Sequence, residues 1–237
     1  MYQTHRIFAK PDMKMSDLIE ENPRLLLLLE HFEIDFAVSD KTIAGICSEN
    51  EISVSLFIIL VNLYNGFHPS NEDIDSLEDI LLILKFLKNS HEYYKNDKYP
   101  EIKGYIDALP HNSYNKEVKL IENFFTDYFN EVLEHLDYED EIAFPYFKML
   151  MGKKNREMMN DFSTDEYRNH HTDIETKLTD LKNLLLMHIK ITDQLPLRRK
   201  LIFSLFEFEY DLQIHALIEE KILLPLIEKI EKETNHG

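Results

Sequence analysis

The sequence after residue 72 consists mostly of long amphipathic stretches, and these limit the possible folds more than any other feature. Between residue 73 and about residue 96, apolar side chains recur at spacings of three and four: Ile74, Leu77, Ile80, Leu81, Leu84 and Leu87. Three more such stretches cover about 114–151, 165–191 and 196–233. Because only five Gly and eight Pro interrupt the 237 residues, we expect an all-α chain whose C-terminal part is an antiparallel four-helix bundle.

The first 66 residues predict a smaller helical part. One helical pattern begins near Ser16 and runs through DLIEENPRLLLLLEHF, and a second covers ISVSLFIILVNLYN. The segment between them, EIDFAVSDKTIAGICSEN, is short and turn-like. The stretch GFHPSNED at 66–73 combines Gly, Pro, Ser and Asn, which is typical of a linker. We therefore expect a small helical domain over residues 1–66 and the bundle over residues 67–237.

The bundle region contains one internal repeat. Residues 135–145 read HLDYEDEIAFP, and residues 215–225 read HALIEEKILLP. Both follow one template: His, three residues, two acids, four residues, Pro. A His followed by an acid four positions later is common on solvated helix faces, but the residue frequencies give the full template odds of about one in a thousand at any one His. Two matches therefore indicate a shared role.

Helix geometry indicates what the repeat could do. Residues four apart on an α-helix lie on one face, so His135 with Glu139, and His215 with Glu219, can each reach one point beside the helix. The apolar residues around each pair place that point in the bundle interior. Because a buried carboxylate is costly without a compensating charge, we expect the two pairs to share a bound cation.

The other two helices of the expected bundle each offer a histidine. His91 lies near the end of the first apolar stripe. In NHHTDIETKL the candidates are His170 and His171, and His171 is favoured because Leu178 lies on its face of the helix. Glu175, four residues after His171, is a further candidate ligand. Nitrogen and oxygen donors without sulfur disfavour copper(I) and structural zinc, and they favour a pair of first-row ions, most often iron.

These residues resemble the metal-binding motifs of the hemerythrin-like family, whose helical bundles hold a non-haem di-iron centre. The blocks HLDYEDEIAFP and HALIEEKILLP are similar to that family's two His-x-x-x-Glu helices. The two-part layout most resembles the repair-of-iron-centres proteins, di-iron proteins for iron–sulfur cluster repair. The resemblance implies two iron ions, with other first-row metals possible, and two bridging glutamates. It assigns the six ligands to His91, His135, Glu139, His171, His215 and Glu219.

By the same resemblance, the chain is expected to act in iron–sulfur cluster repair or iron donation under nitrosative or oxidative stress. Its small ligands would be O₂ or NO, and its partners iron–sulfur proteins. The alternative is a hemerythrin-like module that binds O₂ or NO, or senses iron, without turnover. One departure bears on this choice: the family's small domain carries two adjacent cysteines, whereas this chain has Ala37 and Val38. Cys47 matches a further cysteine of the family, and we expect it to be a small buried apolar residue rather than a reactive thiol.

Composition argues against several partners and compartments. The 44 acidic residues against 26 Lys and Arg give a formal charge of −18, which repels nucleic-acid phosphates and anionic membranes. The longest apolar runs, LLLLL at 25–29 and LFIIL at 56–60, are too short to span a membrane. The N-terminus has no apolar segment like that of a secretion signal, and a single cysteine excludes an intrachain disulfide. We therefore expect a cytoplasmic protein.

Overall fold

The computed structural model describes residues 6–68, 77–109, 111–151, 167, 172–188 and 194–235. All regular elements in these residues are helices, and their one isolated β-bridge joins Lys14 to Thr42. The prediction of an all-α chain is therefore confirmed. Contacts divide the chain into two compact units, one of Met1–Asn89 with Leu217–Gly237 and one of Ser90–Ala216. The expected division between residues 66 and 67 stays a prediction.

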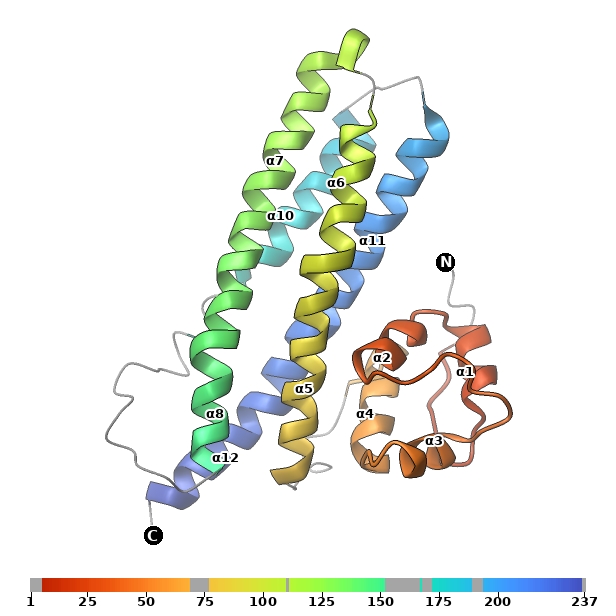
Figure 1. Cartoon of the computed structure of the whole chain (residues 1–237), viewed down its shortest axis with the longest axis vertical. Coiled ribbons are helices and arrows are strands. Elements are labelled where there is room, and N and C mark those ends of the chain that lie inside the picture. The colour runs from red at the N-terminus through yellow and green to blue at the C-terminus, as the bar shows by residue number, and fades with distance from the viewer. Residues whose placement is uncertain are drawn as a thin grey trace. The chain divides into compact units, whose positions relative to one another are not determined.

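The N-terminal part of the first unit contains four short helices (Figure 1): α1 (Met15–Glu21), α2 (Leu25–His31), α3 (Ile43–Glu49) and α4 (Val54–Tyr64). The first helical pattern is two helices rather than the single helix expected, because Pro23 has no N–H and disfavours helical backbone at Asn22. The segment expected to be turn-like contains α3. Its N-terminus is capped by Thr42, whose hydroxyl oxygen accepts from the Gly45 N–H at 3.2 Å.

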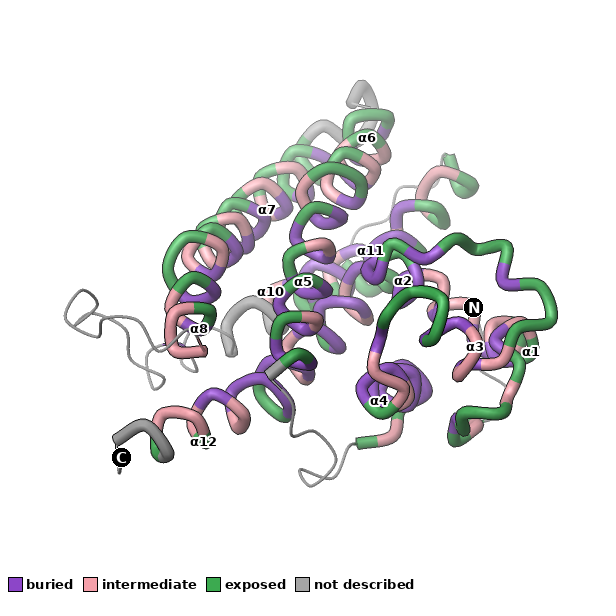
Figure 2. Tube along the Cα trace, turned by 60° about the horizontal axis from the view of Figure 1, so that its bottom comes forward, coloured by how far each residue is buried: buried purple, intermediate pink, exposed green. Residues whose placement is uncertain are grey.

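Helix α4 packs against α2 and α3, and Figure 2 shows it buried around most of its circumference. Its buried residues are Leu56, Phe57, Ile59, Leu60, Val61, Asn62, Leu63 and Tyr64. Buried amide side chains tie its end to other segments. Asn22 donates to the Tyr64 carbonyl at 2.7 Å, and Asn62 accepts from the Ala9 N–H at 2.7 Å. Because a buried polar group is costly when unsatisfied, these bonds fix how the segments meet.

The same unit includes the part of α5 (Leu77–Tyr93) that precedes Ser90. The ring of Phe86 contacts those of His31 and Phe32, with centroids 5.1 and 5.0 Å apart. Asn89 donates from its side-chain amide to the carbonyl of His31 at 2.8 Å. Ring packing and this hydrogen bond therefore hold α2 against α5.

The second unit consists, in the part that is described, of four long helical runs (Figure 1). The first passes from the end of α5 through η1 (Tyr94–Lys98) to α6 (Tyr99–Asp107). The second passes from α7 (His111–Tyr138) through η2 (Glu139–Ala143) to α8 (Phe144–Met151). The third is α10 (Thr172–Asn183) with η4 (Leu184–His188), and the fourth is α11 (Leu195–Ile218). The η segments are π-helical turns, in which N–H groups donate to carbonyls five residues earlier.

Each of the four runs of this unit contacts the next, and the fourth contacts the first. Helix α6 packs on α7, and α7 packs on α10. Thr179 of α10 donates its hydroxyl to Glu209 of α11 at 2.8 Å, and Ser204 of α11 donates to Glu101 of α6 at 2.7 Å. The buried apolar side chains of α7 follow the spacing of an amphipathic helix: Val118, Ile121, Phe125, Tyr128, Phe129, Val132 and Leu136. The apolar pattern of the sequence thus marks the buried face.

The first run continues further than its apolar stripe predicts. The stripe indicates an end near residue 96, whereas α6 extends to Asp107. Pro100 is tolerated within this run because it lies in the first turn of α6, directly after the π turn η1.

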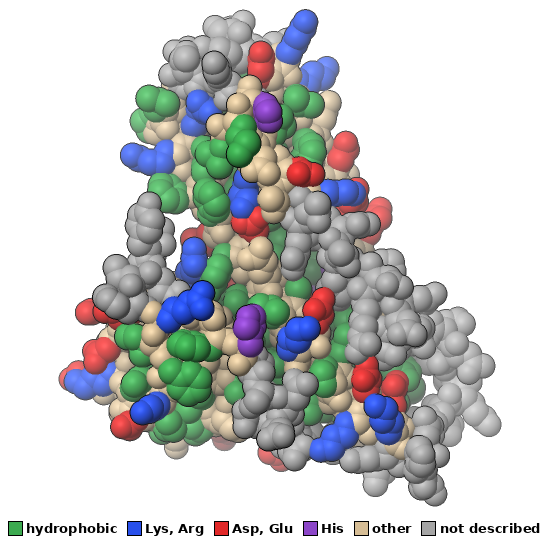
Figure 3. All heavy atoms as spheres, turned by 180° about the vertical axis from the view of Figure 1, so that it is seen from behind, with side chains coloured by type: hydrophobic (Ala, Val, Ile, Leu, Met, Phe, Trp, Pro, Cys, Tyr) green, Lys and Arg blue, Asp and Glu red, His purple; other side chains and the backbone are tan. Residues whose placement is uncertain are grey.

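None of the described helices has both the length and the apolar character of a membrane span. Figure 3 shows one face of the molecule, on which acidic and basic side chains are interspersed with apolar ones. The net charge of −18 is therefore not gathered into one acidic region on that face. Several large apolar side chains of η4 and α11 remain exposed, among them Leu186, Met187, Leu195, Phe203 and Phe206.

Candidate metal centre

Both copies of the repeated block form the same local backbone. In the first copy, Glu139 begins the π turn η2, and the Phe144 N–H donates to the Glu139 carbonyl. In the second copy, Glu219 begins η5 (Glu219–Leu223), and the Leu224 N–H donates to the Glu219 carbonyl. In both copies the template proline is the second residue after the π turn. Because proline lacks an N–H and its ring clashes with the preceding turn of a regular α-helix, a wider π turn before it relieves the clash.

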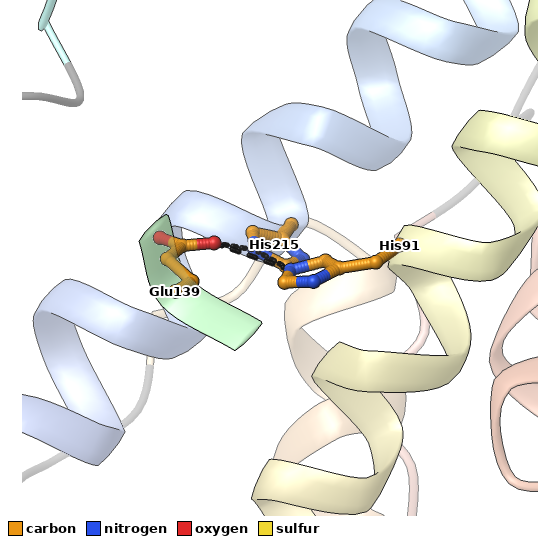
Figure 4. Close-up of side chains that lie close together, drawn as sticks. All are labelled: His91, Glu139 and His215. Carbon is orange, nitrogen blue, oxygen red and sulfur yellow. Dashed lines mark hydrogen bonds and ion pairs between the residues drawn. The ribbon is translucent and has the colours of Figure 1, made fainter. Parts of the chain in front are cut away.

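Three buried side chains of the second unit converge: His91 from α5, Glu139 from η2 and His215 from α11 (Figure 4). Nε2 of His91 lies 3.2 Å from Oε2 of Glu139, and Nε2 of His215 lies 3.7 Å from the same oxygen. The two Nε2 atoms are 3.4 Å apart. Donor atoms bound to one ion at the usual metal–ligand bond lengths lie about 3.0–3.5 Å from one another. The spacing therefore fits a shared metal ion.

His135 approaches the other oxygen of the same carboxylate. Its Nε2 lies 3.0 Å from Oε1 of Glu139, four residues further along the helical run, as helix geometry predicts. The two oxygens of Glu139 therefore face different imidazoles. Oε1 faces His135, and Oε2 faces His91 and His215.

Asp140 holds the second nitrogen of His91. Nδ1 of His91 lies 3.1 Å from Oδ1 of Asp140, and Nζ of Lys95 lies 3.2 Å from Oδ2. Burial raises the pKa of Asp140, but the contacts with His91 and Lys95 outweigh burial and lower the pKa below its ordinary value. The negative charge of an ionised Asp140 beside Nδ1 favours the tautomer of a neutral His91 ring that carries its proton on Nδ1 and keeps the lone pair on Nε2. That lone pair faces the same space as Glu139.

The charge of Glu139 is the main electrostatic feature of the site. Burial alone would raise the pKa of its carboxyl group, which is 0% exposed. The imidazoles of His135, His215 and His91 more than offset burial and hold the pKa well below its usual range. A fully buried anion needs a compensating positive charge. That charge comes either from protonated imidazoles or from a bound cation.

Aromatic rings surround the two imidazoles that face Oε2. The ring of His91 stacks on Phe144, with centroids 5.4 Å apart and an interplanar angle of 20°. Tyr94 meets His215 edge-on at 5.9 Å. These rings restrict the orientation of the imidazoles and keep water away from the charged group, which strengthens electrostatic interactions within it.

The structure places four of the six predicted ligands close together. His91, Glu139 and His215 form the buried group, and His135 contacts Glu139.

The other predicted ligands have a different status. Glu219 is fully buried but belongs to the other compact unit, so its role as a ligand stays a prediction. His171 lies outside the described residues, as does its competitor His170. The side chain of Glu175 is also outside the described part of the chain.

Two residues that the sequence analysis did not single out contact the site. Asp140 is the second acid of the template in its first copy, so the repeat itself could have indicated it. Ser90 precedes His91, and its hydroxyl oxygen lies 2.9 Å from Nδ1 of His215 on α11. Nothing in the sequence indicates Ser90, because its role depends on how α5 packs against α11.

The fold and the site define an all-helical protein with a buried His–Glu group that could hold a metal ion. Comparison with known families finds no family model that matches the chain, and no curated protein matches it. The resemblance to the hemerythrin-like family therefore rests on the motif residues alone.

Proposed function

We propose that this chain is a non-haem di-iron protein of the hemerythrin-like type, which repairs iron–sulfur clusters or donates iron to them under nitrosative or oxidative stress. The observation that carries the proposal is the buried group of His91, Glu139 and His215. Its donor atoms are nitrogen and oxygen only, a set that suits iron and other first-row ions. The ring of contacts among α6, α7, α10 and α11 is that expected of a four-helix bundle.

Two ions rather than one are favoured because the two oxygens of Glu139 face different imidazoles. Oε1 lies 3.0 Å from His135, while Oε2 lies 3.2 Å from His91. A carboxylate in that position can connect two ions, each with its own imidazoles. His171 and Glu219 would complete the ligand set.

The residues of the chain would hold the ions in an oriented and water-poor site. The charge of Asp140, 3.1 Å from Nδ1 of His91, would favour a proton on that nitrogen, and stacking on Phe144 restricts rotation of the ring. When bound, iron would supply one-electron redox chemistry and an affinity for O₂ and NO. Donation of iron to a damaged cluster would require the ions to leave, and the partner would then be an iron–sulfur protein.

A second candidate, a module that binds O₂ or NO or senses iron without turnover, is favoured by the state of Cys47. That thiol is fully buried, and burial raises its pKa to about 11. A buried, protonated thiol is a poor nucleophile and a poor metal ligand. Ala37 and Val38 replace the paired cysteines of the cluster-repair proteins that the chain resembles. Thiol chemistry therefore has no evident place in this chain.

The proposal is tested first by metal content. Protein purified without oxygen from iron-replete cells is expected to hold about two iron ions per chain by mass spectrometry of the metals. Glu139→Gln should reduce that content to near zero. Glu141→Gln is the matched control, because Glu141 lies on the same π turn but is exposed. Wild-type protein without bound metal would refute the proposal.

Activity then separates the two candidates. The iron-loaded protein is added to an iron–sulfur enzyme whose cluster has been nitrosylated, with an equal amount of ferrous salt as the control. Recovery above that control supports repair. A reversible spectral change on exposure to NO, with no recovery of the enzyme, supports the binding module.

A further inference from the structure

The backbone of the two repeated blocks occurs again in the first run of the second unit. Residues 90–100 read SHEYYKNDKYP. The π turn η1 begins at Tyr94, and the Tyr99 N–H donates to the Tyr94 carbonyl. Pro100 is the second residue after this turn, as the template proline is in the repeated blocks. Tyr94 therefore occupies the backbone position that Glu139 occupies in the first block.

The side chain of Tyr94 lies beside the candidate metal centre. Tyr94 and Glu139 are both 0% exposed, and the ring of Tyr94 meets that of His215 edge-on, with centroids 5.9 Å apart. A phenol, unlike a carboxylate, can lose one electron to the strong oxidants that form when O₂ is reduced. The first run therefore places an oxidisable side chain where the repeated blocks place an acid.

Asp211 provides the proton acceptor that such an oxidation requires. Removal of one electron makes a phenol strongly acidic, so the hydroxyl hydrogen leaves as a proton. The Tyr94 hydroxyl donates to Oδ2 of Asp211 at 2.9 Å, and Asp211 is 1% exposed. Because the acceptor is already hydrogen-bonded to the phenol, the electron and the proton can leave Tyr94 together. No charged phenol then has to form in the buried interior.

Tyr93 extends the path toward solvent. Its ring lies beside that of Tyr94, with centroids 5.6 Å apart. Its hydroxyl donates to Oε1 of Glu207 at 3.2 Å. The ring of Tyr93 is buried, whereas the side chain of Glu207 is 48% exposed. Two neighbouring phenols, each with its own carboxylate on α11, therefore lead from His215 to the surface of the second unit.

We propose that Tyr94, and behind it Tyr93, donate single electrons to the metal centre when iron bound there reduces O₂. The inference rests on the proposed function, because it needs both the iron and the reaction of that iron with O₂. The iron supplies the oxygen chemistry, and the chain supplies the two phenols, their proton acceptors and the contact with His215.

Electrons and protons balance when both tyrosines take part. Reduction of one O₂ to two water molecules needs four electrons and four protons. Two ferrous ions become ferric and supply two of the electrons, and Tyr94 and Tyr93 supply the other two. In each tyrosine the O–H bond breaks, the proton passes to Asp211 or Glu207, and a neutral tyrosyl radical remains. These two protons and two from solvent complete the water molecules.

The tyrosines determine how far the reduction of O₂ proceeds. Without them the two ferrous ions supply only two electrons, which with two protons convert O₂ to hydrogen peroxide. Peroxide oxidises exposed iron–sulfur clusters. Complete reduction to water would therefore suit a centre whose partner is an iron–sulfur protein.

The test uses the full-length protein, loaded with Fe²⁺ without oxygen, mixed with O₂ and frozen at a series of early times. Electron paramagnetic resonance should show a tyrosyl radical, and its signal should change in width when ring-deuterated tyrosine is incorporated. Peroxide released per iron is measured in parallel. Tyr94→Phe should lose most of the radical signal and should release several-fold more peroxide than wild type.

Two further variants separate the path from a general effect of losing a hydroxyl group. Tyr93→Phe should retain a radical at Tyr94 and prolong its lifetime, because no second phenol returns an electron to it. Tyr105→Phe is the matched control, since Tyr105 also donates its hydroxyl to a carboxylate, that of Glu101 at 3.1 Å, but lies on α6 beyond the π turn. It should behave as wild type.

Three results would overturn the inference: an unchanged radical in Tyr94→Phe, an equal loss in Tyr105→Phe, or O₂ consumption by iron-loaded wild type without any radical. Each would leave the proposed di-iron centre intact. Failure of wild type to bind iron would instead refute the proposed function, and this inference with it. If Tyr94→Phe does not fold, Asp211→Asn removes the proton acceptor and should likewise suppress the radical and raise peroxide release.

Discussion

The two copies of the repeated block have the same backbone but different side-chain surroundings. In each copy the template glutamate begins a π turn and the proline follows it. The second acid differs. Asp140 of the first copy lies 3.1 Å from His91 with its side chain 17% exposed, whereas Glu220 of the second copy is 43% exposed and lies 3.7 Å from Lys221.

This difference separates what a sequence repeat fixes within one helix from what the packing between helices fixes. The proline and the helical spacing operate within a single helix, so both copies reproduce the same turn. The partners of the second acid come from another helix: Asp140 meets His91 and Lys95 of the first run, while Glu220 lies beside its own neighbour in sequence. A symmetrical repeat therefore produces an asymmetrical site.

The largest expected effect comes from removing one ligand of either block. His135→Ala and Glu219→Ala should each lose at least one metal ion per chain, because each removes a predicted donor. Since the bound metal stabilises only the folded state, the melting temperature of the metal-loaded protein should fall by about 5–10 °C. Metal analysis and calorimetry check this. Unchanged metal content in Glu219→Ala would show that the glutamates of the two blocks do not have the same role.

A smaller effect is expected from the second acid, and in one block only. Asp140→Asn should lower metal affinity about 10- to 100-fold, because the amide no longer places a negative charge behind Nδ1 of His91. Glu220→Gln, at the equivalent position, should leave affinity unchanged. Chelator competition with Zn²⁺ measures both. Equal losses in the two variants would show that the template, and not the tertiary contact with His91, gives the second acid its role.

The prolines test whether the shared backbone is needed. Pro145→Ala restores an N–H and removes the ring clash, so the π turn η2 can relax toward a regular α-helix. Metal-free protein should become more stable by about 1 kcal/mol in urea denaturation, and metal affinity should fall because Glu139 is displaced. Pro225→Ala is the companion variant in the second block. A stability gain without loss of metal affinity would show that the π turn relieves the proline clash but is not needed for metal binding.

The smallest effect is expected outside both blocks, at Glu101. Burial raises its pKa, but Lys98, Ser204 and Tyr105 outweigh burial and lower the pKa from 4.5. Its stabilising contribution is therefore present above the unfolded-state pKa and is lost as pH falls through the lower folded-state pKa. Because Glu101 is partly exposed, we expect Glu101→Gln to cost less than about 1 kcal/mol near neutral pH. Urea denaturation of both proteins should show this difference shrinking below pH 4, and a constant difference would contradict the assignment.

Much of the helical architecture was predictable, because helix formation depends on local spacing and on breaks in it. The apolar stripes predicted the long runs, and the helical pattern ISVSLFIILVNLYN predicted α4. Two expectations were wrong because a single residue set a helix boundary that the apolar pattern does not show. Pro23 divides the first pattern into α1 and α2, and Thr42 caps a helix in a segment expected to be a turn.

The sequence by itself indicated which residues of the two blocks could bind a metal ion and on which helical faces they lie, since the template of His, acids and Pro encodes both within eleven residues. Only the tertiary structure decided that His91, Glu139 and His215 meet, that Asp140 turns to His91, and that Ser90 reaches His215. The physical reason is that periodicity fixes a side chain's direction from its own helix axis. The partner in that direction depends on how two helices pack against each other. That packing is determined by many apolar contacts spread along both helices.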